Sequence, residues 1–229
     1  HDFVGIEFSI HGMLDGRVRV GMPGKFNADN ALAALAVCTL ALSGGSGVLD
    51  DHTKQAILGS LVKVRVDGRM EIAHVSKKCS VIVDYAHNAV SMESLLTTLR
   101  DYHPKRLVCV FGCGGNRARD RRYSMGEIGG KMADFCIITA DNPRFEKNED
   151  IIKDIEVGLA KTDGTYLVIP DRREAIFYAI RNAEEGDMIA IIGKGHEDYQ
   201  EINGVRYPFL DRQVIEEVVT ELEKSQKEV

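Results

Sequence analysis

Two opposite charges and an amide stand together in residues 141–144, which have the sequence DNPR and follow a short apolar run at residues 135–138. Such a run is typical of a buried strand, and in open α/β sheets ligands bind beyond the carboxyl ends of strands. The carboxylate of Asp141 can pair with an ammonium, and the guanidinium of Arg144 can hold a carboxylate through two parallel hydrogen bonds. Together they would suit an amino acid. The alternative interpretation is a polar turn, because Asp, Asn and Pro are common turn residues.

The composition is that of an ordinary globular protein, with 229 residues, 44% hydrophobic and 28% charged. A net charge of -6 argues against nucleic acid or an anionic membrane as partner. No apolar run approaches the roughly 20 residues that a membrane span needs, and no basic-then-apolar leader opens the chain. We therefore expect a cytoplasmic protein that binds neither nucleic acid nor membrane, and a monomer.

The five cysteines form no C-x-x-C pair, and the histidines lack the spacing of metal ligands. We expect no metal site. We also expect the thiols to be reduced and buried, as in a cytosolic protein. These cysteines are Cys38, Cys79, Cys109, Cys113 and Cys136.

The first part of the chain opens within a strand, residues 1–10, that has no preceding cap or turn, so we expect a fragment of a longer protein. A turn at Asp15 leads to a second strand and completes a hairpin. Residues 31–42 are almost entirely apolar, which predicts a helix buried on all sides, with Asn27 placed to cap it. Charge and turn signals at residues 67–71 predict a domain boundary shortly afterwards, between about Ala73 and Cys79.

After this boundary, strand and helix patterns alternate to the end of the chain. Alternation of this kind predicts right-handed βαβ units and a mostly parallel, doubly wound sheet. Asp171 with Glu174 resembles a capping box, and Asp211 is placed to cap the last helix. Four polar loops each follow a strand, and the fold would bring them together at one edge of the sheet. They are residues 84–87, 112–117, 141–144 and 193–197.

Two of these loops invite nucleotide interpretations that do not hold. Residues 112–117 lack the third glycine of G-x-G-x-x-G, and no acidic ribose partner stands out. Gly195 replaces the Ser or Thr that a Walker loop needs after its lysine, and Met188 stands where the first glycine belongs. Five polar residues in the loops after the strands are more informative than these two motifs. They offer two guanidinium groups, two carboxylates and an amide, which suit a zwitterion with an additional carboxylate and amine. They are Arg117, Asp141, Asn142, Arg144 and Glu197.

Six segments stand in the order found in Mur ligases, and the chain resembles that family over nearly its whole length. The pair DNPR and GKGHE is the most specific part of the match. The resemblance implies that residues 1–77 are the C-terminal part of an α/β central, ATP-binding domain. Residues 78–229 would be the complete, Rossmann-like C-terminal domain that binds the amino acid. The segments are residues 24–34 (GKFNADNALAA), 68–71 (GRME), 84–87 (DYAH), 112–117 (GCGGNR), 141–144 (DNPR) and 193–197 (GKGHE).

The resemblance further implies an ATP- and Mg²⁺-dependent ligase of peptidoglycan precursor synthesis, which adds meso-diaminopimelate to UDP-MurNAc-L-Ala-D-Glu through an acyl phosphate. ATP would be bound by Asn27, Arg69, Asp84 and His87. Arg117 and Arg144 would hold carboxylates of meso-diaminopimelate, while Asp141 and Glu197 would hold its ammonium. The matching positions of the amino-acid pocket are Arg117, Asp141, Asn142, Arg144, Gly193 and Glu197.

The family's N-terminal UDP-sugar domain, its P-loop and its carbamylated lysine have no counterpart in these residues. No catalytic set is therefore complete here, and we expect this chain by itself neither to hydrolyse ATP nor to ligate. Three alternatives stay open: an L-lysine-adding tripeptide synthetase, another Mur-type ligase such as a folylpolyglutamate synthetase, and a binding module without catalysis.

Overall fold

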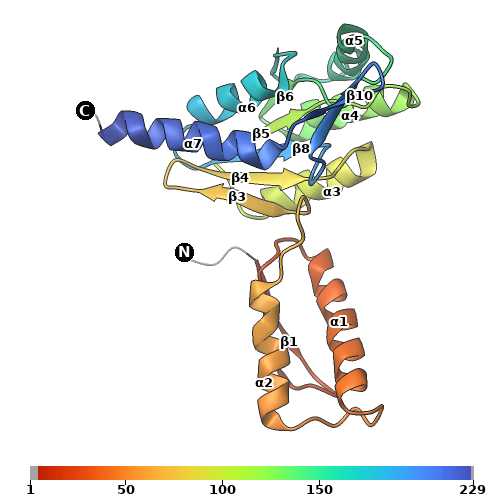
Figure 1. The fold of residues 1–229 in the computed structure, drawn as a ribbon, viewed down its shortest axis with the longest axis vertical. Helices are drawn as coiled ribbons and strands as arrows, with labels where there is room; N and C mark the ends of the chain where they lie inside the picture. The colour runs from red at the N-terminus through yellow and green to blue at the C-terminus, as the bar shows by residue number, and fades with distance from the viewer. Residues whose placement is uncertain (1–4, 228–229) are drawn as a thin grey trace. The chain divides into compact units, whose positions relative to one another are not determined.

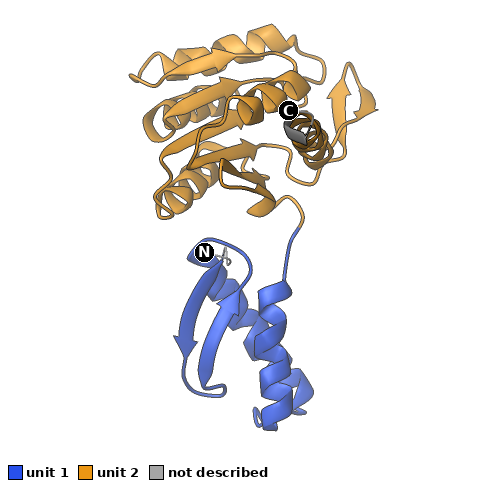
Figure 2. Ribbon diagram, turned by 90° about the vertical axis from the view of Figure 1, so that its left-hand side faces the viewer, with its two compact units in different colours: residues 1–66 blue, residues 67–229 orange. Residues whose placement is uncertain are grey.

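The structure is a computed structural model that describes residues 5–227, and it divides into two compact units. Unit 1 comprises residues 1–66 and unit 2 residues 67–229 (Figures 1 and 2). The division lies about ten residues before the expected boundary at residue 77. The reason is β3 (Glu71–Val75), which pairs antiparallel with β4 (Cys79–Asp84) and so belongs to the sheet of unit 2.

Unit 1 contains the expected hairpin, in which β1 (Ile6–Ile10) pairs antiparallel with β2 (Gly16–Val20). The first four residues of the predicted strand lie outside the described part of the chain. Inward side chains of this hairpin, such as Val18 and Val20, pack in one core with Leu35 and Leu58. The helices that supply these partners are α1 (Phe26–Leu42) and α2 (Asp51–Ser60), and α2 is followed by the 3₁₀ turn η1 (Leu61–Lys63).

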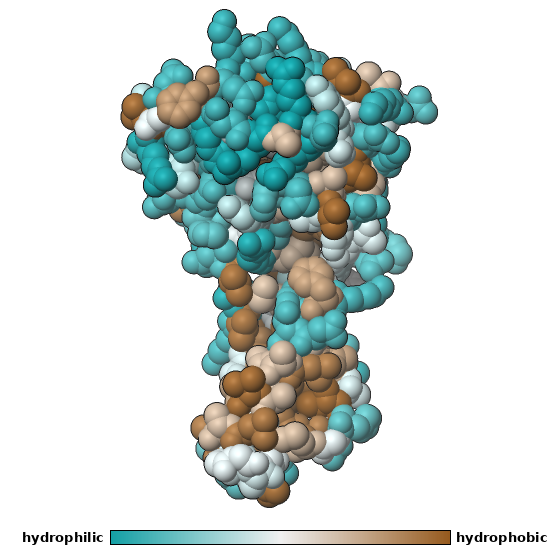
Figure 3. Space-filling model, turned by 90° about the vertical axis from the view of Figure 1, so that its right-hand side faces the viewer, coloured by the Kyte–Doolittle hydropathy of each residue, from teal (hydrophilic) through white to brown (hydrophobic). Residues whose placement is uncertain are grey.

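The prediction that the apolar helix is buried on all sides is wrong. One face of α1, which includes Ala31 and Leu35, is buried against the core of unit 1. Its remaining surface is also apolar but exposed, and Val37 has 68% of its surface accessible. In the described part of unit 1, the β1–β2 hairpin and α2 pack against α1, and together they cover a single face of it. Figure 3 shows the resulting apolar surface of unit 1.

Asn27 is not the cap of α1, because it lies one residue inside the helix. Its side-chain amide donates to the carbonyl of Pro23 at 2.7 Å, so it ties the helix to the chain that enters it. Its carbonyl accepts from the amide of Asn30 at 3.0 Å. With 3% of its surface accessible, Asn27 is a buried polar residue whose hydrogen bonds are satisfied within unit 1.

Unit 2 is built on a six-stranded sheet with the order β3-β4-β8-β5-β6-β7. All neighbours pair in parallel except β3 with β4, which confirms the predicted doubly wound α/β fold. The parallel strands after β4 are β5 (Arg106–Phe111), β6 (Phe135–Ile138), β7 (Tyr166–Val168) and β8 (Asp187–Ile192). The helices are α3 (Ala89–Arg100), α4 (Asp120–Met132), α5 (Asn148–Leu159), α6 (Arg172–Arg181) and α7 (Asp211–Lys227).

Helices cover both faces of this sheet, which explains why its strands read as continuous apolar runs (Figure 1). Along β5, Leu107 and Cys109 point into the core shared with α3, α4 and α5. The alternate residues Val108 and Val110 point into the core shared with α6 and α7. The three-layer arrangement leaves the carboxyl ends of the parallel strands as the edge at which loops can form a site.

Helix starts in unit 2 were predicted with mixed success. Asp171 caps α6 as expected, since its carboxylate accepts from the backbone N–H of Glu174 at 3.0 Å. Asp211 is instead the first residue of α7, and its carboxylate is fully buried against Arg172. The hairpin of β9 (Tyr199–Ile202) and β10 (Val205–Pro208), which follows the GKGHE loop, was not predicted from the sequence.

The cysteines are all free thiols, but Cys38 is exposed, contrary to the prediction that every thiol is buried. Burial raises the pKa of Cys113 and of Cys136 to about 12, so neither forms the reactive thiolate near neutral pH. We therefore expect a thiol reagent at pH 8 to modify one cysteine per folded chain, Cys38, and all five after denaturation. Peptide mapping checks the site, and Cys38→Ser should abolish the rapid reaction; rapid labelling of Cys113 would contradict this account.

Candidate functional site

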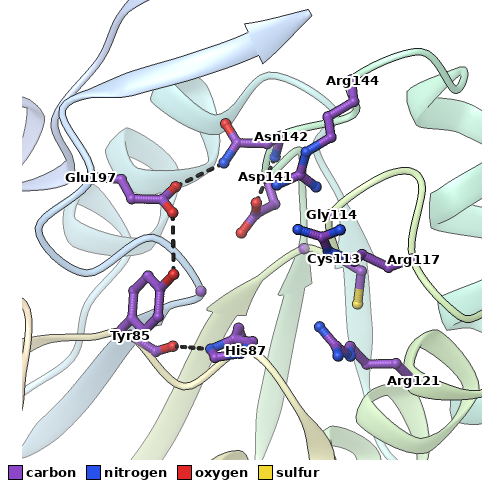
Figure 4. Close-up of a pocket in the computed structure, with 12 residues that line it drawn as sticks. Tyr85, His87, Cys113, Gly114, Arg117, Arg121, Asp141, Asn142, Arg144 and Glu197 are labelled. Atoms are coloured by element: carbon purple, nitrogen blue, oxygen red, sulfur yellow. Dashed lines mark hydrogen bonds between the residues drawn. The ribbon is translucent and has the colours of Figure 1, made fainter.

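The four polar loops of unit 2 converge as predicted, around a cavity of about 280 Å³. They follow β4, β5, β6 and β8, which are parallel neighbours in the sheet. Figure 4 shows side chains from these loops and from the start of α4 facing one another across this pocket. The residues that line it are Tyr85, His87, Gly112, Cys113, Gly114, Arg117, Arg121, Asp141, Asn142, Arg144, Gly193 and Glu197.

Close backbone approach brings the loops together. Gly115 lies against the DNPR loop, and a Cβ at this position would stand 1.9 Å from the carbonyl oxygen of Pro143. Gly193 has a φ of +111° and faces Asp141, whose Oδ2 would lie 2.6 Å from an added Cβ. Only glycine fits both the positive φ and the space beside Asp141, so residue 193 contributes to the site by letting the backbone approach that carboxylate.

Asp141 provides a carboxylate at the wall of the pocket, although only 7% of its surface is accessible. Its Oδ1 accepts from the backbone N–H of Asn142 at 2.6 Å. Its carbonyl accepts from the side chain of Gln200, on β9, at 2.9 Å. The carboxylate has no ion-pair partner among the described residues, which leaves its charge available to a cationic group in the pocket.

Arg144 is held at the pocket edge by the β9–β10 hairpin. Its backbone N–H donates to the carbonyl of Glu201 at 2.9 Å, and its own carbonyl accepts from the N–H of Asn203 at 2.6 Å. The residue adopts a φ of 53°, which is uncommon for any residue other than glycine. Its guanidinium donates to the carbonyl of Gly115 at 2.8 Å and lies 3.7 Å from the carboxylate of Glu201. The hairpin therefore sets where this guanidinium can point.

Asn142, Lys194 and Glu197 form a polar network behind the pocket wall. The amide of Asn142 donates to Oε2 of Glu197 at 2.7 Å. Lys194 is fully buried, and its ammonium lies 3.3 Å from both Oε2 of Glu197 and the side-chain oxygen of Asn142. The hydroxyl of Tyr85 donates to the other carboxylate oxygen of Glu197 at 3.4 Å. Glu197 thus presents one oxygen, Oε1, that has only a single long hydrogen bond.

The loop that carries Arg117 is fixed by a separate ion network. Arg122, on α4, pairs with Glu146 at 2.8 Å and with Asp154 at 2.9 Å. Glu146 also accepts the backbone N–H of Asn116, whose side chain in turn accepts from the N–H of Phe145. These bonds join the loop after β5 to the loop after β6. Arg117 and Arg121 have no ion-pair partner within residues 5–227, and Figure 4 shows both facing the pocket.

The pocket offers partners for both charges of a zwitterion. Three guanidinium groups can bind carboxylates, and two carboxylates can bind ammonium groups. The guanidinium groups belong to Arg117, Arg121 and Arg144, and the carboxylates belong to Asp141 and Glu197.

A family model described as "Mur ligase, glutamate ligase domain" matches residues 68–195, more than half of the chain. The chain belongs to the Mur ligase family. The start of the match at residue 68 agrees with the start of unit 2 at residue 67.

Curated relatives and solved structures agree with this assignment. A UDP-N-acetylmuramoyl-L-alanyl-D-glutamate--2,6-diaminopimelate ligase from Aquifex aeolicus is 46% identical over 86% of this chain and 38% of its own length. The enzyme of the same name from Caldanaerobacter subterraneus is 40% identical over 96% of this chain and 44% of its own length. A solved structure of such a ligase has 34% identity and a TM-score of 0.68, over 91% of this chain and 41% of its own. The chain therefore spans about two fifths of the length of these relatives.

All six positions predicted for the amino-acid pocket line the cavity of this Mur ligase chain. Arg121, at the start of α4 and four residues after Arg117, was not among the residues predicted from the sequence. Lys194, which does not line the cavity, was not predicted either; the available signal was a lysine between two glycines after a strand.

The residues predicted to bind ATP do not all lie in the same unit. Asn27 lies in unit 1 and is satisfied there, while the other three belong to unit 2. Asp84 accepts the backbone N–H groups of Met70 and Ala86, each at 2.7 Å, so it also has a structural role in the turn before β3. Burial raises the pKa of Asp84. Arg69 stacks over the ring of Tyr85 at 4.7 Å, and His87 lines the pocket.

Proposed function

We propose that this chain is the amino-acid-binding part of a longer ligase that adds meso-diaminopimelate to UDP-MurNAc-L-Ala-D-Glu with ATP, in peptidoglycan precursor synthesis. The observation that carries the proposal is the pocket itself, in which three guanidinium groups and two carboxylates face a common cavity. The names of the curated relatives, at 40–46% identity, support the same activity. Residues 1–66 would be the end of the ATP-binding domain, and residues 67–229 the C-terminal domain.

In this proposal the pocket holds one end of meso-diaminopimelate and leaves the other amine free to react. Arg117 and Arg144 bind carboxylates, while Asp141 and Glu197 bind the ammonium of the held end. Asn142 and Gly193 shape the wall between them. The free amine attacks the carbonyl of an acyl phosphate formed from ATP and the γ-carboxylate of the nucleotide substrate. A carbon–nitrogen bond forms, phosphate leaves, and the amine loses a proton, so catalysis rests on positioning and charge stabilisation.

The nucleotide side of the reaction would involve Arg69, Asp84 and His87 in unit 2, and Asn27 in unit 1. Within residues 5–227 no group of three or more His, Cys, Asp or Glu side chains is arranged to hold a metal ion. The described residues thus offer no preformed set of three such ligands, whereas Mg²⁺ usually binds through one or two carboxylates together with substrate phosphates. No helix among the described residues is long and apolar enough to cross a membrane.

A competition assay tests the proposal on the longer ligase that carries this chain. The enzyme receives ATP, Mg²⁺, the nucleotide dipeptide and equal concentrations of meso-diaminopimelate and L-lysine, and the product is identified by mass. We expect the diaminopimelate product to dominate by at least tenfold, because a site built to pair a second carboxylate is left with unpaired charges by lysine. A dominant lysine product would contradict the proposal that meso-diaminopimelate is the substrate. If neither amino acid gives a product and glutamate does, the result would favour a folylpolyglutamate synthetase.

A further inference from the structure

Lys194 is a buried cation beside the pocket whose role the proposed function does not explain. It lies two residues after the end of β8, and none of its surface is accessible. Its Nζ contacts three acceptors: the side-chain oxygen of Asn142, Oε2 of Glu197 and the carbonyl of Tyr199. Three acceptors match the three N–H donors of an ammonium group, so the geometry is that of a charged lysine. Because it does not line the cavity, any effect on a ligand must pass through its neighbours.

One such neighbour is Asn142, whose amide orientation depends on Lys194. The side-chain oxygen of Asn142 accepts from Lys194 at 3.3 Å and from the backbone N–H of Glu201 at 2.9 Å. The reverse orientation would set its NH₂ group against an ammonium and an N–H. Two donors on one side therefore fix the amide, and its nitrogen points to Glu197 at 2.7 Å.

Glu197 is the second neighbour, and the network selects which of its oxygens faces a ligand. Oε2 accepts from both Asn142 and Lys194. Among the described residues, Oε1 accepts only from Tyr85, at a long 3.4 Å, and Figure 4 shows the carboxylate between Asn142 and Tyr85. Oε1 is consequently the oxygen available to an ammonium in the pocket. Without Lys194, Oε2 of Glu197 would lose one of its two hydrogen bonds and the carboxylate could rotate more freely, while the amide of Asn142 would keep the bond from the N–H of Glu201 alone on its oxygen.

The charge of Lys194 also affects which ligand the pocket favours. The pocket wall carries three guanidinium groups and two carboxylates, and Lys194 adds a further positive charge directly behind Glu197. An excess of positive charge favours a ligand with two carboxylates and two ammonium groups over a ligand such as lysine, which has one carboxylate fewer. Lys194 is fully buried and Asp141 nearly so, and water therefore screens their charges less than that of the exposed Arg117.

We propose that Lys194 is a positioning and specificity residue, which orients Asn142 and Glu197 to receive an ammonium at Oε1 of Glu197 and biases the pocket towards an amino acid with two carboxylates. This inference rests on the proposed function. It predicts that Lys194 affects the amino-acid substrate and leaves ATP untouched, a division that a merely structural residue would not produce.

The test measures steady-state kinetics of the longer ligase with Lys194→Met, which keeps the apolar stem and removes the charge. We expect the KM for meso-diaminopimelate to rise about 10- to 100-fold, the effect of losing a hydrogen bond to a charged group, with the KM for ATP within about twofold. The preference for diaminopimelate over lysine, as a ratio of kcat/KM, should fall about tenfold. The control is Lys78→Met, because Lys78 is an exposed lysine that precedes β4 at the opposite end of the sheet, and its side-chain hydrogen bond among the described residues is to the backbone carbonyl of Arg181.

The outcomes separate this inference from the proposed function. If the parent enzyme does not use diaminopimelate, the proposed function fails; if it does and Lys194→Met changes neither KM nor preference, this inference alone fails. Should Lys194→Met not fold, Lys194→Met/Glu197→Gln removes both charges of the pair and is compared with Glu197→Gln. A role through Glu197 predicts a further rise in KM of at most about threefold, because coupled residues are not additive. A further rise above tenfold would overturn that role.

Discussion

The Arg172→Met variant is expected to lose about 3–5 kcal/mol of unfolding free energy, because it leaves the carboxylate of Asp211 buried without a cation. Neither side chain of this pair has any accessible surface. Two hydrogen bonds of 2.7 Å join the guanidinium of Arg172 to the two carboxylate oxygens of Asp211. An isolated charge in such surroundings is among the few causes of a very large destabilisation by one substitution.

Arg172 also holds the two strand ends that lead into the site. It donates to the carbonyl of Ala140 at 3.2 Å and to the carbonyl of Ile192 at 3.1 Å. These residues directly precede Asp141 and Gly193. The Arg172→Met variant should therefore loosen the pocket as well as the core, and weaken amino-acid binding in the molecules that remain folded.

Chemical denaturation followed by circular dichroism checks this prediction. The matched control is Glu221→Ala, which removes an exposed pair with Arg181 and should cost less than about 1 kcal/mol. The double variant Arg172→Met/Asp211→Leu removes both buried charges and should be more stable than Arg172→Met alone. A loss below about 1 kcal/mol for Arg172→Met would show that the buried pair does not stabilise unit 2.

Arg144→Lys is expected to raise the KM of the longer ligase for meso-diaminopimelate by one to two orders of magnitude, with little change in the KM for ATP. Lysine keeps the charge but loses the planar fork that binds a carboxylate through two parallel bonds. Loss of one such charged hydrogen bond accounts for a change of about this size. The backbone strain at residue 144, where φ is 53°, is the same for both side chains and does not contribute.

The same variant should lose discrimination between meso-diaminopimelate and L-lysine, because the second carboxylate is what Arg144 is proposed to recognise. Arg119→Lys is the matched control, since Arg119 has a side chain 66% exposed and pairs with Asp154 outside the pocket. An unchanged KM for diaminopimelate in Arg144→Lys would remove this residue from the proposed binding site.

The doubly wound sheet of unit 2 and all six positions expected for the amino-acid pocket could be predicted before the structure was known, whereas Arg121 was not. Apolar runs separated by amphipathic helices require a parallel sheet covered on both faces, and β4, β5, β6 and β8 follow that pattern. Polar loops after parallel strands must meet at one edge, so the convergence of DNPR with GKGHE could be predicted before the strand order was known.

How these side chains are held depends on contacts between segments that are distant in sequence. The pairing of Arg172 with Asp211 spans 39 positions of sequence, and no local pattern indicates it. The β9–β10 hairpin that positions Arg144, and the buried contacts of Lys194, depend in the same way on segments that meet only after folding. The periodicity of α1 likewise could not show which of its apolar faces would be covered. Local patterns specify elements and the loops between them, whereas burial and charge pairing depend on which distant residues arrive beside them.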